Sequence, residues 1–441
     1  MDRSHAGSNR VTRRRFTAAG AAVGLGLSAA SYARAVGAND RVRLAFIGVG
    51  NRGSQLLDAF LTHDDAEPVV FCDVYEPYLD RARERVGKPV DTTIDFRRVL
   101  DRSDVDAVVV ATPDHWHALM TIWACRAGKD VYVEKPLSIT VVEGRKMVEA
   151  ARDNARVVQV GTHRRSSKLY RRAAEWIGSG GIGKVTVSRA YRLSNMFPDG
   201  IGKAPPSEPP AGLHWDLWLG PRPARPFQAT IAPYKFRWWH LYSSQMANWG
   251  VHYLDAIRWL TGEEAPSAVC AMGGRYAVDD DRTIPDTLEV TFEFASGRLA
   301  VFGQYEASGN PALASGEIEL RGTQGTAYID ERKLTVVPEK GGQFQTGGVR
   351  MDPIEWAEES GGNASLTAAH ARNFLDCIKS REKPNADVEI GHRSTTFALI
   401  ANIALAAKSR LEWDPKLERF TNNADANRLL HYEYREPWRL D

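Results

Sequence analysis

Segments of strand length alternate with amphipathic helical segments in the first 160 residues of the chain. The strand-like segments lie at residues 42–47, 68–72, 106–111, 129–133 and 157–161. Continuous apolar runs such as residues 106–111 are typical of strands buried on both faces of a parallel sheet. The alternation of strands and helices predicts that residues 36–160 form an α/β domain, with a doubly wound parallel sheet of the Rossmann type.

The pattern changes after residue 161. Short segments of alternating polar and apolar residues are joined by glycine turns, at residues 184–192, 288–294, 299–305, 316–321, 325–329 and 333–337. Residues 251–260, 367–380 and 394–409 have helical patterns, and residues 194–236 are irregular, as in a long binding loop. We expect residues 161–441 to form an α+β domain with an open, mostly antiparallel sheet. One face of such a sheet needs a cover, which predicts a homodimer or homotetramer.

The first 35 residues have the pattern of an export signal. Residues 12–16 fit the twin-arginine motif S/T-R-R-x-F, a short apolar stretch rich in Ala and Gly follows, and residues 33–35 form an A-x-A cleavage pattern. A disordered basic tail is the alternative. We expect an exported, periplasmic protein that uses the twin-arginine translocase. The apolar stretch is too short to span a membrane, and no later segment is long and apolar enough.

Removal of residues 1–35 reverses the sign of the net charge. The segment carries a formal charge of +5, so the charge of the chain changes from +2 to −3. This balance argues against a nucleic-acid partner, which usually requires a basic surface. No C-x-x-C motif occurs, and we predict no metal site. We expect four free, buried thiols at Cys72, Cys125, Cys270 and Cys377.

A glycine-rich turn directly follows the first strand. The run Gly48-Val49-Gly50-Asn51-Arg52-Gly53 has the form G-x-G-x-x-G and leads into a helical segment. In this context Gly48 allows a tight turn, Gly50 allows a pyrophosphate to approach the backbone, and Gly53 allows the helix to pack on the strand. Asn51 and Arg52 begin the helix, whose first N–H groups would hold the phosphates. A plain tight turn is the alternative.

An acidic residue at the end of the second strand extends this dinucleotide-binding pattern. Asp73 lies 25 residues after Gly48, where its carboxylate can accept hydrogen bonds from the ribose hydroxyls. This position favours NAD as the cofactor. NADP stays possible because Arg52 could meet a 2′-phosphate.

Two further strand ends supply candidate residues for the same site. Thr112, Pro113 and His117 follow one strand, and Glu134 and Lys135 follow the next. Ligands of doubly wound sheets bind beyond the carboxyl ends of the strands, so we expect these residues beside the cofactor. Lys135 can bond both a ribose hydroxyl and a substrate hydroxyl, and its charge would favour an alkoxide that develops during hydride loss. A solvated surface lysine is the alternative.

His252 is the candidate acid–base group. Asn248 and His252 are four residues apart, so they share a face if this segment is helical. A neutral imidazole can take the proton of a substrate hydroxyl while the cofactor takes the hydride. A structural histidine is the alternative, and it is the reading we favour for other isolated histidines such as His163.

Aromatic residues are concentrated between Trp215 and Trp259. Sugar rings have apolar faces that stack on indoles, and Arg or Gln side chains can bond their hydroxyls. The segment therefore favours a carbohydrate or polyol substrate, although tryptophan is also an ordinary core residue. The candidate substrate-binding residues are Arg164, Arg237, Trp238, Trp239, Tyr242 and Gln245.

Together these motifs resemble the Gfo/Idh/MocA oxidoreductases, a family named for glucose–fructose oxidoreductase and inositol dehydrogenase. The resemblance covers residues 41–441 and depends on the glycine turn, Thr112-Pro113 with His117, and the segments 134–137, 249–252, 373–378 and 391–394. Residues 215–221 and 433–438 resemble the exported bacterial branch of the family. The resemblance implies a C-terminal domain with an open sheet, dimers or tetramers, and tightly bound NAD(P). It also implies oxidation or reduction of a sugar or polyol hydroxyl, with Lys135 and His252 at the nicotinamide.

The chain departs from the family pattern just before His252. Members commonly have Asp four residues before this histidine and three glycines before the segment, whereas this chain has Asn248 and Tyr242-Ser243-Ser244. A neutral Asn cannot stabilise a histidinium electrostatically. Three readings stay open: a lower activity, a different acid–base group such as Tyr242 or Tyr253, or a different chemistry.

Three functions are compatible with these residues. The first is an exported NAD(P)-dependent oxidoreductase that acts on a CH–OH group of a sugar or polyol and recycles a tightly bound cofactor. The second is an NAD-dependent glycosidase, in which transient oxidation at C3 acidifies C2 and permits elimination. The third is a non-catalytic sugar-binding protein, which Asn248 keeps open.

Overall fold

The computed structural model describes residues 41–359 and 363–440. The predicted twin-arginine signal at residues 1–35 lies outside the described residues. Across the two described ranges, none of the helices combines the length and the apolar character needed to cross a membrane.

Six strands form the first sheet, in the order β3-β2-β1-β4-β5-β6. All of its strand pairs are parallel. Strands β4 and β5 are buried along their whole length, which explains their apolar sequences. This strand order is that of the Rossmann fold, so the predicted doubly wound parallel sheet is confirmed. The strands are β1 (Val42–Ile47), β2 (Ala66–Cys72), β3 (Asp91–Thr93), β4 (Ala107–Val110), β5 (Asp130–Val133) and β6 (Val158–Val160).

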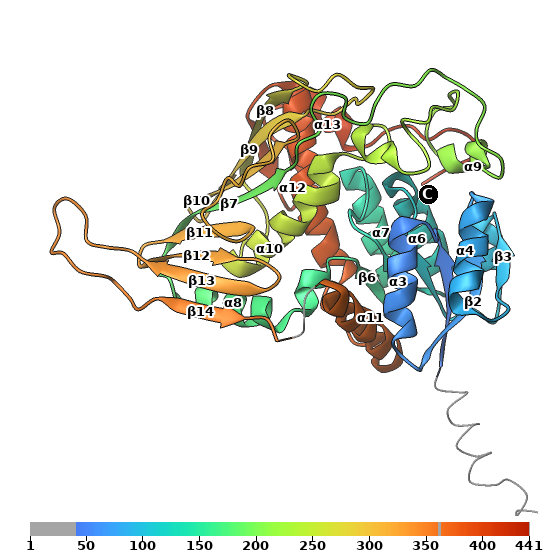
Figure 1. Ribbon diagram of the computed structural model, residues 1–441, viewed down its shortest axis with the longest axis horizontal. Coiled ribbons are helices and arrows are strands. Elements are labelled where there is room, and N and C mark those ends of the chain that lie inside the picture. The colour runs from blue at the N-terminus through green and yellow to red at the C-terminus, as the bar shows by residue number, and fades with distance from the viewer. Residues whose placement is uncertain (1–40, 360–362, 441) are drawn as a thin grey trace, which may run out of the picture.

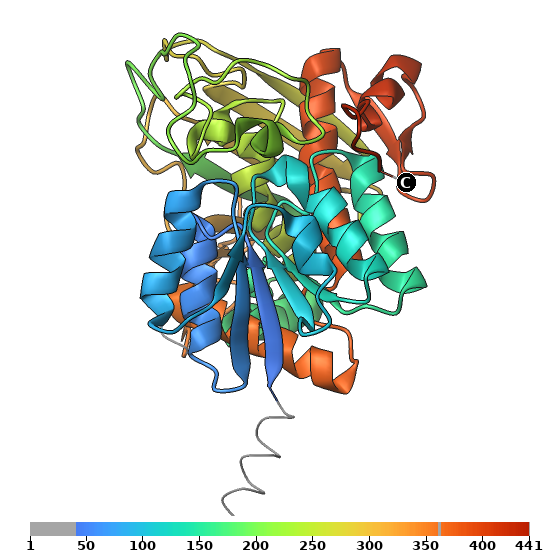
Figure 2. The same ribbon diagram turned by 90° about the vertical axis from the view of Figure 1, so that its right-hand side faces the viewer.

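Helices cover both faces of this sheet (Figure 2). One apolar core includes Phe46, Phe60 and Phe71, and the core on the other face includes Val108 and Leu119. The connecting helices are α3 (Asn51–Leu61), α4 (Glu76–Val86), α5 (Phe96–Leu100), α6 (His117–Arg126) and α7 (Val141–Asp153). Figure 2 also shows an irregular segment, in green, that lies above the carboxyl ends of the strands.

Ten strands form the second sheet, in the order β14-β13-β12-β11-β7-β10-β9-β8-β15-β16. Its neighbouring strands are antiparallel except β7 and β10, which are parallel. The prediction of a mostly antiparallel sheet is therefore confirmed. The strands are β7 (Val185–Leu193), β8 (Ala268–Gly274), β9 (Thr287–Phe294), β10 (Arg298–Tyr305), β11 (Ile318–Gly322), β12 (Gly325–Ile329), β13 (Lys333–Pro338), β14 (Ile354–Ala357), β15 (Leu411–Asp414) and β16 (Arg419–Phe420).

Three helices pack on one face of the second sheet, namely α8 (Lys168–Gly178), α10 (Val251–Thr261) and α12 (Val388–Ala407). In Figure 1, α10 and α12 lie between this sheet and the Rossmann sheet. Side chains of successive strand residues point to opposite faces, so alternate residues of β8 are buried and exposed. The expectation of four buried thiols is therefore wrong for Cys270, which occupies an exposed position of β8. The other three cysteines are free and buried, as predicted.

The last part of the chain returns to the Rossmann sheet. Helix α11 (Asn363–Ser380) packs beside α3, and the ring of Phe374 lies 6.2 Å from that of Phe60. Near the end of the chain, Trp438 packs against Phe96 and Trp116. The segment after residue 160 therefore supplies core residues to both sheets. The remaining short helices are η1 (Asp114–Trp116), η2 (His163–Ser166), α9 (Trp215–Leu219), η3 (Lys235–Trp238), η4 (Met246–Gly250), α13 (Ala424–Asn427) and η5 (Arg428–Leu430).

Candidate active site

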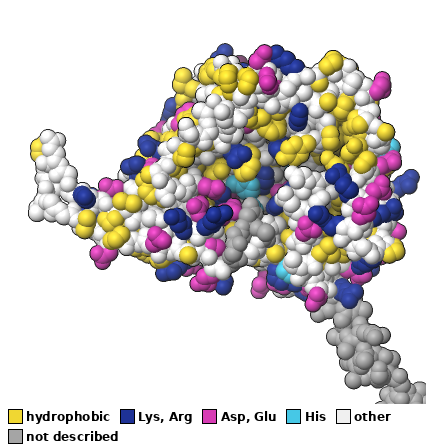
Figure 3. Space-filling model, viewed as in Figure 1, with side chains coloured by type: hydrophobic (Ala, Val, Ile, Leu, Met, Phe, Trp, Pro, Cys, Tyr) yellow, Lys and Arg dark blue, Asp and Glu magenta, His cyan; other side chains and the backbone are white. Residues whose placement is uncertain are grey.

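A pocket lies at the carboxyl ends of the Rossmann strands and extends to the second sheet. Its lining includes the glycine turn, Asp73, the segment Thr112–Pro113, Lys135 and His252. In the space-filling view, basic, acidic and histidine side chains gather at the junction of the two halves (Figure 3). The chain thus brings together side chains that are more than 200 residues apart in the sequence.

The glycine turn is closely packed between β1 and β4. Gly48 has a φ of +84°, and a Cβ at this position would lie 2.7 Å from the carbonyl carbon of Ala111. A Cβ at Gly53 would lie only 2.0 Å from the oxygen of Gly48. Both positions therefore require glycine, for the left-handed conformation and for the close approach of α3 to β1.

The start of helix α3 is free to bind an anion. Its N-cap, Gly50, has no side chain to accept the first N–H groups, and the first turn contains no acidic residue. Gly50, Asn51 and Arg52 line the pocket. Unpaired N–H groups and the helix dipole attract a phosphate group at such a position. The turn therefore fits the pyrophosphate of a dinucleotide.

Asp73 is held rigidly beside this turn. Its Oδ2 accepts a hydrogen bond from the N–H of Val49 at 2.8 Å, and its Oδ1 accepts one from the N–H of Tyr75 at 2.9 Å. Burial raises the pKa of Asp73 to about 6. Each carboxylate oxygen keeps a second lone pair with which it can accept a hydroxyl hydrogen. Asp73 therefore fits the ribose of the cofactor.

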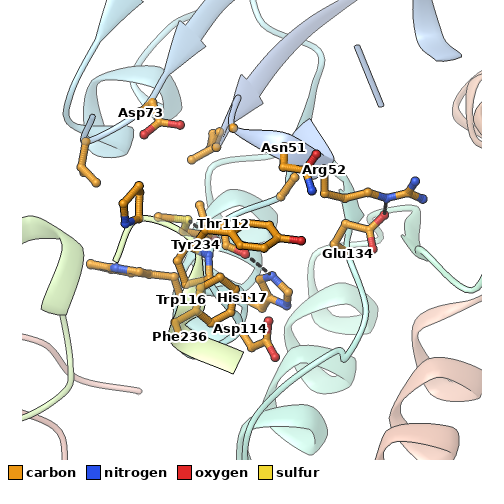
Figure 4. Close-up of a pocket in the computed structure, with 18 of the residues that line it drawn as sticks. Asn51, Arg52, Asp73, Thr112, Asp114, Trp116, His117, Glu134, Tyr234 and Phe236 are labelled. Carbon is orange, nitrogen blue, oxygen red and sulfur yellow. Dashed lines mark hydrogen bonds and ion pairs between the residues drawn. The ribbon is translucent and has the colours of Figure 1, made fainter. Parts of the chain in front are cut away.

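Arg52 binds a carboxylate of the protein. Its Nε donates a hydrogen bond to Oε1 of Glu134 at 2.7 Å, and its Nη1 donates one to Gln55. In Figure 4 this ion pair lies on the opposite side of the view from Asp73. The role considered for Arg52, contact with a 2′-phosphate, is therefore not favoured by its position. The acidic Asp73 and the paired Arg52 both support NAD over NADP.

His117 links the ends of two strands. Its Nδ1 lies 2.7 Å from the carbonyl oxygen of Pro136, and its Nε2 lies 3.0 Å from that of Thr112 (Figure 4). Both ring nitrogens are thus engaged by the backbone at the edge of the pocket. We infer that His117 holds the segments after β4 and β5 in place, and that Thr112 and Pro113 contact the cofactor from this fixed edge.

Lys135 lines the pocket just after β5. Its Nζ donates hydrogen bonds to the backbone oxygen of Asn248 at 3.0 Å and to the Oδ1 of Asn248 at 3.4 Å. Burial lowers the pKa of Lys135 to about 8, although the negative charges of Glu134 and Asp114 oppose this shift. A buried ammonium group with neutral acceptors can transfer its hydrogen bond to a ligand oxygen.

His252 lies at the start of α10, next to Lys135. Burial lowers its pKa well below the usual range, and the positive charge of Lys135 lowers it further. Its ring lies 5.4 Å from that of His163 and 6.1 Å from that of Trp249, between centroids. His252 is therefore a neutral imidazole that faces the pocket and can accept a proton.

The segment before His252 differs from the helix considered in the sequence analysis. Met246–Gly250 forms a turn of π-helix, and the α-helix begins only at Val251. Asn248 lines the pocket with His252, but its side chain and its carbonyl accept hydrogen bonds from Lys135. A π-turn inserts an extra residue into the helical register. The α-helical rule that residues four apart share a face therefore does not apply to Asn248 and His252.

Glu331 and His163 are pocket residues that sequence reasoning missed. Oε1 of Glu331 lies 3.2 Å from Nε2 of His163 and 3.2 Å from Nε of Arg164. Despite burial, these two neighbours lower the pKa of Glu331 to about 2. Glu331 lies in the turn between β12 and β13, and no motif marks it, so only the fold reveals its position.

The substrate-binding candidates separate into two groups. Arg164 and Arg237 line the pocket, whereas Trp238, Trp239, Tyr242 and Gln245 do not. The four that lie outside it have structural contacts: Trp238 and Gln245 bond Glu306, Trp239 bonds the oxygen of Thr230, and Tyr242 is 0% exposed. Aromatic residues of the pocket lining include Trp218 and Trp249, together with Trp116, Tyr234 and Phe236, which are labelled in Figure 4.

Tyr242 and Tyr253, the alternative acid–base groups, are buried away from the pocket. Tyr253 is 4% exposed and packs against Phe302 with ring centroids 5.9 Å apart. Neither tyrosine lines the pocket. Among the described residues no cluster of three or more His, Cys, Asp or Glu side chains could hold a metal ion.

Three consecutive segments match models of one protein family. Residues 42–162 match "Oxidoreductase family, NAD-binding Rossmann fold" of GFO/IDH/MocA, residues 217–328 match the "GFO/IDH/MocA C-terminal domain", and residues 363–440 match "Oxidoreductase family, C-terminal alpha/beta domain". Residues 42–162 are thus an NAD-binding Rossmann domain, as the glycine turn predicts.

Similar curated proteins match over a limited length. "Glycosyl hydrolase family 109 protein 1" of Shewanella sp. (strain ANA-3) is 37% identical over 118 residues, which are 25% of this chain and 26% of that protein. "Alpha-N-acetylgalactosaminidase" of Shewanella oneidensis is 36% identical over 118 residues, again 25% of this chain and 26% of that protein. The match thus spans only about a quarter of these relatives.

Similar solved structures match over most of the chain. Levoglucosan dehydrogenase in complex with NADH and levoglucosan has a TM-score of 0.63 and 21% identity, and the match covers 84% of this chain and 99% of that one. A putative myo-inositol dehydrogenase from Sinorhizobium meliloti 1021 has a TM-score of 0.59 and 20% identity, with the same coverage of 84% and 99%. At this level of identity the likeness shows the fold.

Proposed function

Because this chain belongs to the GFO/IDH/MocA oxidoreductase family, we propose that it oxidises a hydroxyl group of a sugar or polyol, or reduces the corresponding carbonyl, with NAD as cofactor. The observation that carries the proposal is the placement of Lys135 and a neutral His252 in the pocket that also contains the glycine turn and Asp73. The levoglucosan and myo-inositol in the names of the structural neighbours support a sugar or polyol as substrate.

Lys135 and His252 have different roles at the CH–OH group. When bound, the nicotinamide ring supplies hydride transfer to and from the substrate carbon. In oxidation the proton of the hydroxyl leaves to His252, whose imidazole is neutral and free to accept it. Lys135 donates a hydrogen bond from Nζ to the substrate oxygen and stabilises its developing negative charge. In reduction the same groups act in reverse, with a protonated His252 as the proton donor.

The positions of Lys135 and Asn248 support catalysis without a carboxylate next to His252. Asn248 accepts hydrogen bonds from Lys135 and so aims the ammonium group into the pocket. Glu331 supplies an anionic charge next to His163, whose ring packs against that of His252. Both features support a working oxidoreductase over a non-catalytic sugar-binding protein.

The glycosidase is the second candidate function. It is favoured by the family 109 glycosyl hydrolases among the curated relatives. Transient oxidation at C3 would acidify the proton at C2, loss of that proton would expel the glycosidic oxygen from C1, and addition of water with return of the hydride would complete the cycle. This route needs the same Lys135 and His252, but it consumes no cofactor overall.

The proposal includes export and self-association. Residues 12–16 supply the twin-arginine motif, and a cofactor held tightly in a folded protein suits this route. The exposed face of the second sheet carries apolar side chains such as Met272, which is 75% exposed, and Leu299. A second copy of the chain would cover this face in a homodimer or homotetramer.

The proposed function is tested on the folded protein as purified. We expect bound nucleotide, detected by absorbance and fluorescence at the reduced-nicotinamide wavelength and by acid release. Addition of sugars, polyols and glycosides one at a time is expected to change its redox state. Cleavage of a glycoside without net reduction favours the glycosidase, and a protein that neither retains nor binds nucleotide overturns both enzymatic functions.

The rate of oxidation is expected to depend on pH through Lys135. The ammonium form stabilises the alkoxide and predominates below the pKa of about 8, so kcat/KM should be flat near neutrality and fall about tenfold per pH unit at higher pH. The pKa of His252 lies well below 6.5, so the acidic limb should begin well below that value. An arginine stays charged at these pH values, so whatever activity the Lys135→Arg variant has should not fall as the pH rises. An alkaline limb that survives this change contradicts the assignment to Lys135.

A further inference from the structure

Arg237 is a cation of the pocket that has no ion-pair partner among the described residues. It lies in η3, and its guanidinium carbon is 4.3 Å from the centre of the Tyr234 ring and 5.3 Å from that of Trp238. Its Nε is buried and donates no hydrogen bond. Within residues 41–359 and 363–440, no carboxylate forms an ion pair with it. Buried polar groups are normally satisfied, so this guanidinium is available for a ligand.

The other arginines that line the pocket are neutralised. Arg52 is paired with Glu134 at 2.7 Å, and Arg164 is paired with Glu331 at 3.2 Å and with Glu317. Asp114 lies near Arg237, but it is 3% exposed and accepts a hydrogen bond from Ser243. Among the lysine and arginine side chains of the lining, Lys135 and Arg237 are therefore the two that form no ion pair with a carboxylate of the described residues.

A second arginine without an ion pair, Arg192, lies beside the pocket. The guanidinium carbon of Arg192 lies 3.8 Å from the centre of the Trp249 ring, and Trp249 lines the pocket. The Nε of Arg192 is also buried without a hydrogen bond, and the described residues include no ion-pair partner for it. Two aromatic side chains of the pocket, Tyr234 and Trp249, are thus each in cation–π contact with an arginine.

Arg237 lies with the reacting groups and not with the phosphate-binding turn. The pKa of Lys135, lowered mainly by burial, is lowered further by the charge of Arg237. The same charge acts on Asp114, whose net shift is upward because of burial. The cofactor phosphates fit the start of α3 at Gly50 and Asn51. A group that binds Arg237 therefore belongs to the substrate.

We propose that the substrate is an acidic sugar, whose carboxylate or sulfate group is bound by Arg237. This inference rests on the proposed function and defines its substrate class. A guanidinium presents a planar fork of N–H donors that matches two oxygens of an oxyanion. A neutral sugar would leave this charge half-buried and unpaired, whereas an oxyanion would satisfy it. The aromatic rings of Tyr234 and Trp249 leave room for the apolar face of the same sugar.

Binding measured by calorimetry or by tryptophan fluorescence tests the inference without turnover. The probes are glucuronate against glucose, galacturonate against galactose, and glucose 6-sulfate, each with the nucleotide-loaded protein. We expect at least one acidic sugar to bind about tenfold to a hundredfold more tightly than its neutral counterpart. Arg237→Gln should remove this preference, which is measured as the ratio of the two affinities in the same variant. Arg237→Lys should restore part of it, because the charge stays and the fork is lost.

Arg225→Gln is the matched control. Arg225 comes from the same irregular segment and stacks on Trp239, with its guanidinium carbon 4.8 Å from the ring centre, but it does not line the pocket. Its replacement should leave the preference for acidic sugars unchanged. A preference for glucuronate or galacturonate over glucose 6-sulfate identifies a carboxylate as the bound group, and the opposite order identifies a sulfate.

The outcomes separate this inference from the proposed function. Binding of an acidic sugar that depends on Arg237, without any redox change of the bound nucleotide, supports the inference and overturns the oxidoreductase. Oxidation of neutral sugars that ignores Arg237 supports the oxidoreductase and overturns the inference. Failure of every acidic probe to bind more tightly than its neutral counterpart also overturns it.

Discussion

Replacement of Lys135 by Met is expected to lower turnover by about 10²–10³-fold while the protein keeps its nucleotide. The side chain is partly buried just after β5, and its Nζ donates to two oxygens of Asn248. Met fills a similar volume, so the pocket keeps its shape but loses the charge that stabilises an alkoxide. The measurement is single-turnover reduction of the bound nucleotide by substrate, together with the nucleotide content after acid release.

Lys129, which flanks the same strand at its other end, provides a matched control. It directly precedes β5, at the opposite end from the cofactor, and its Nζ donates hydrogen bonds to the oxygens of Arg102 at 2.6 Å and Val105 at 2.8 Å. Lys129→Met should lower the free energy of unfolding by about 1–3 kcal/mol, because it leaves two carbonyls unpaired. Its folded fraction should turn over at the normal rate. Unchanged turnover in Lys135→Met would refute the role of Lys135.

Local sequence predicts the cofactor end of the pocket well. The glycine turn, Asp73 and Lys135 are all placed by the ends of parallel strands, and strand ends are encoded by short apolar runs followed by polar residues. The close contact of Gly53 with Gly48 is also local, whereas the contact of Gly48 with Ala111 follows from the pairing of β1 with β4 in the parallel sheet. The motif, the acidic residue and the lysine are therefore readable from short stretches of sequence.

The substrate end depends on contacts that the sequence does not encode locally. Glu331 reaches His163 across 168 residues, from a turn whose composition is ordinary. Trp238 and Trp239 belong to the aromatic-rich segment, but the 3₁₀ turn of η3 directs them to Glu306 and Thr230, and Arg237 to the pocket. Composition shows that aromatic side chains are abundant there, and only the backbone of the turn decides which of them face the ligand.

The secondary structure shows the same limit. The helical pattern of residues 251–260 predicts α10 well, but the π-turn at Met246–Gly250 has no periodic signal of its own. The expected burial of Cys270 is wrong because apolar composition alone does not tell which face of β8 the helices cover. In both cases tertiary packing sets the position of a side chain that local pattern leaves open.

Replacement of His252 by Ala is expected to lower the rate of oxidation by about 10²–10⁴-fold, because the hydroxyl proton loses its acceptor. The imidazole of His252 forms no hydrogen bond with the described residues, and it packs against the rings of His163 and Trp249. The variant should therefore keep its fold and its nucleotide. Added imidazole should restore part of the rate, since the truncated side chain leaves space beside the substrate oxygen.

The control for His252 is His240→Ala, because His240 is exposed and bonds only Thr283 outside the cofactor pocket. This variant should keep the normal rate and show no response to imidazole. If His252→Ala reacts within about threefold of the original protein, the proton must leave by another route. Tyr242 and Tyr253 are too deeply buried to provide one, so such a result would move the search to His163 and Glu331, the neighbouring pair that can carry a proton away from the pocket.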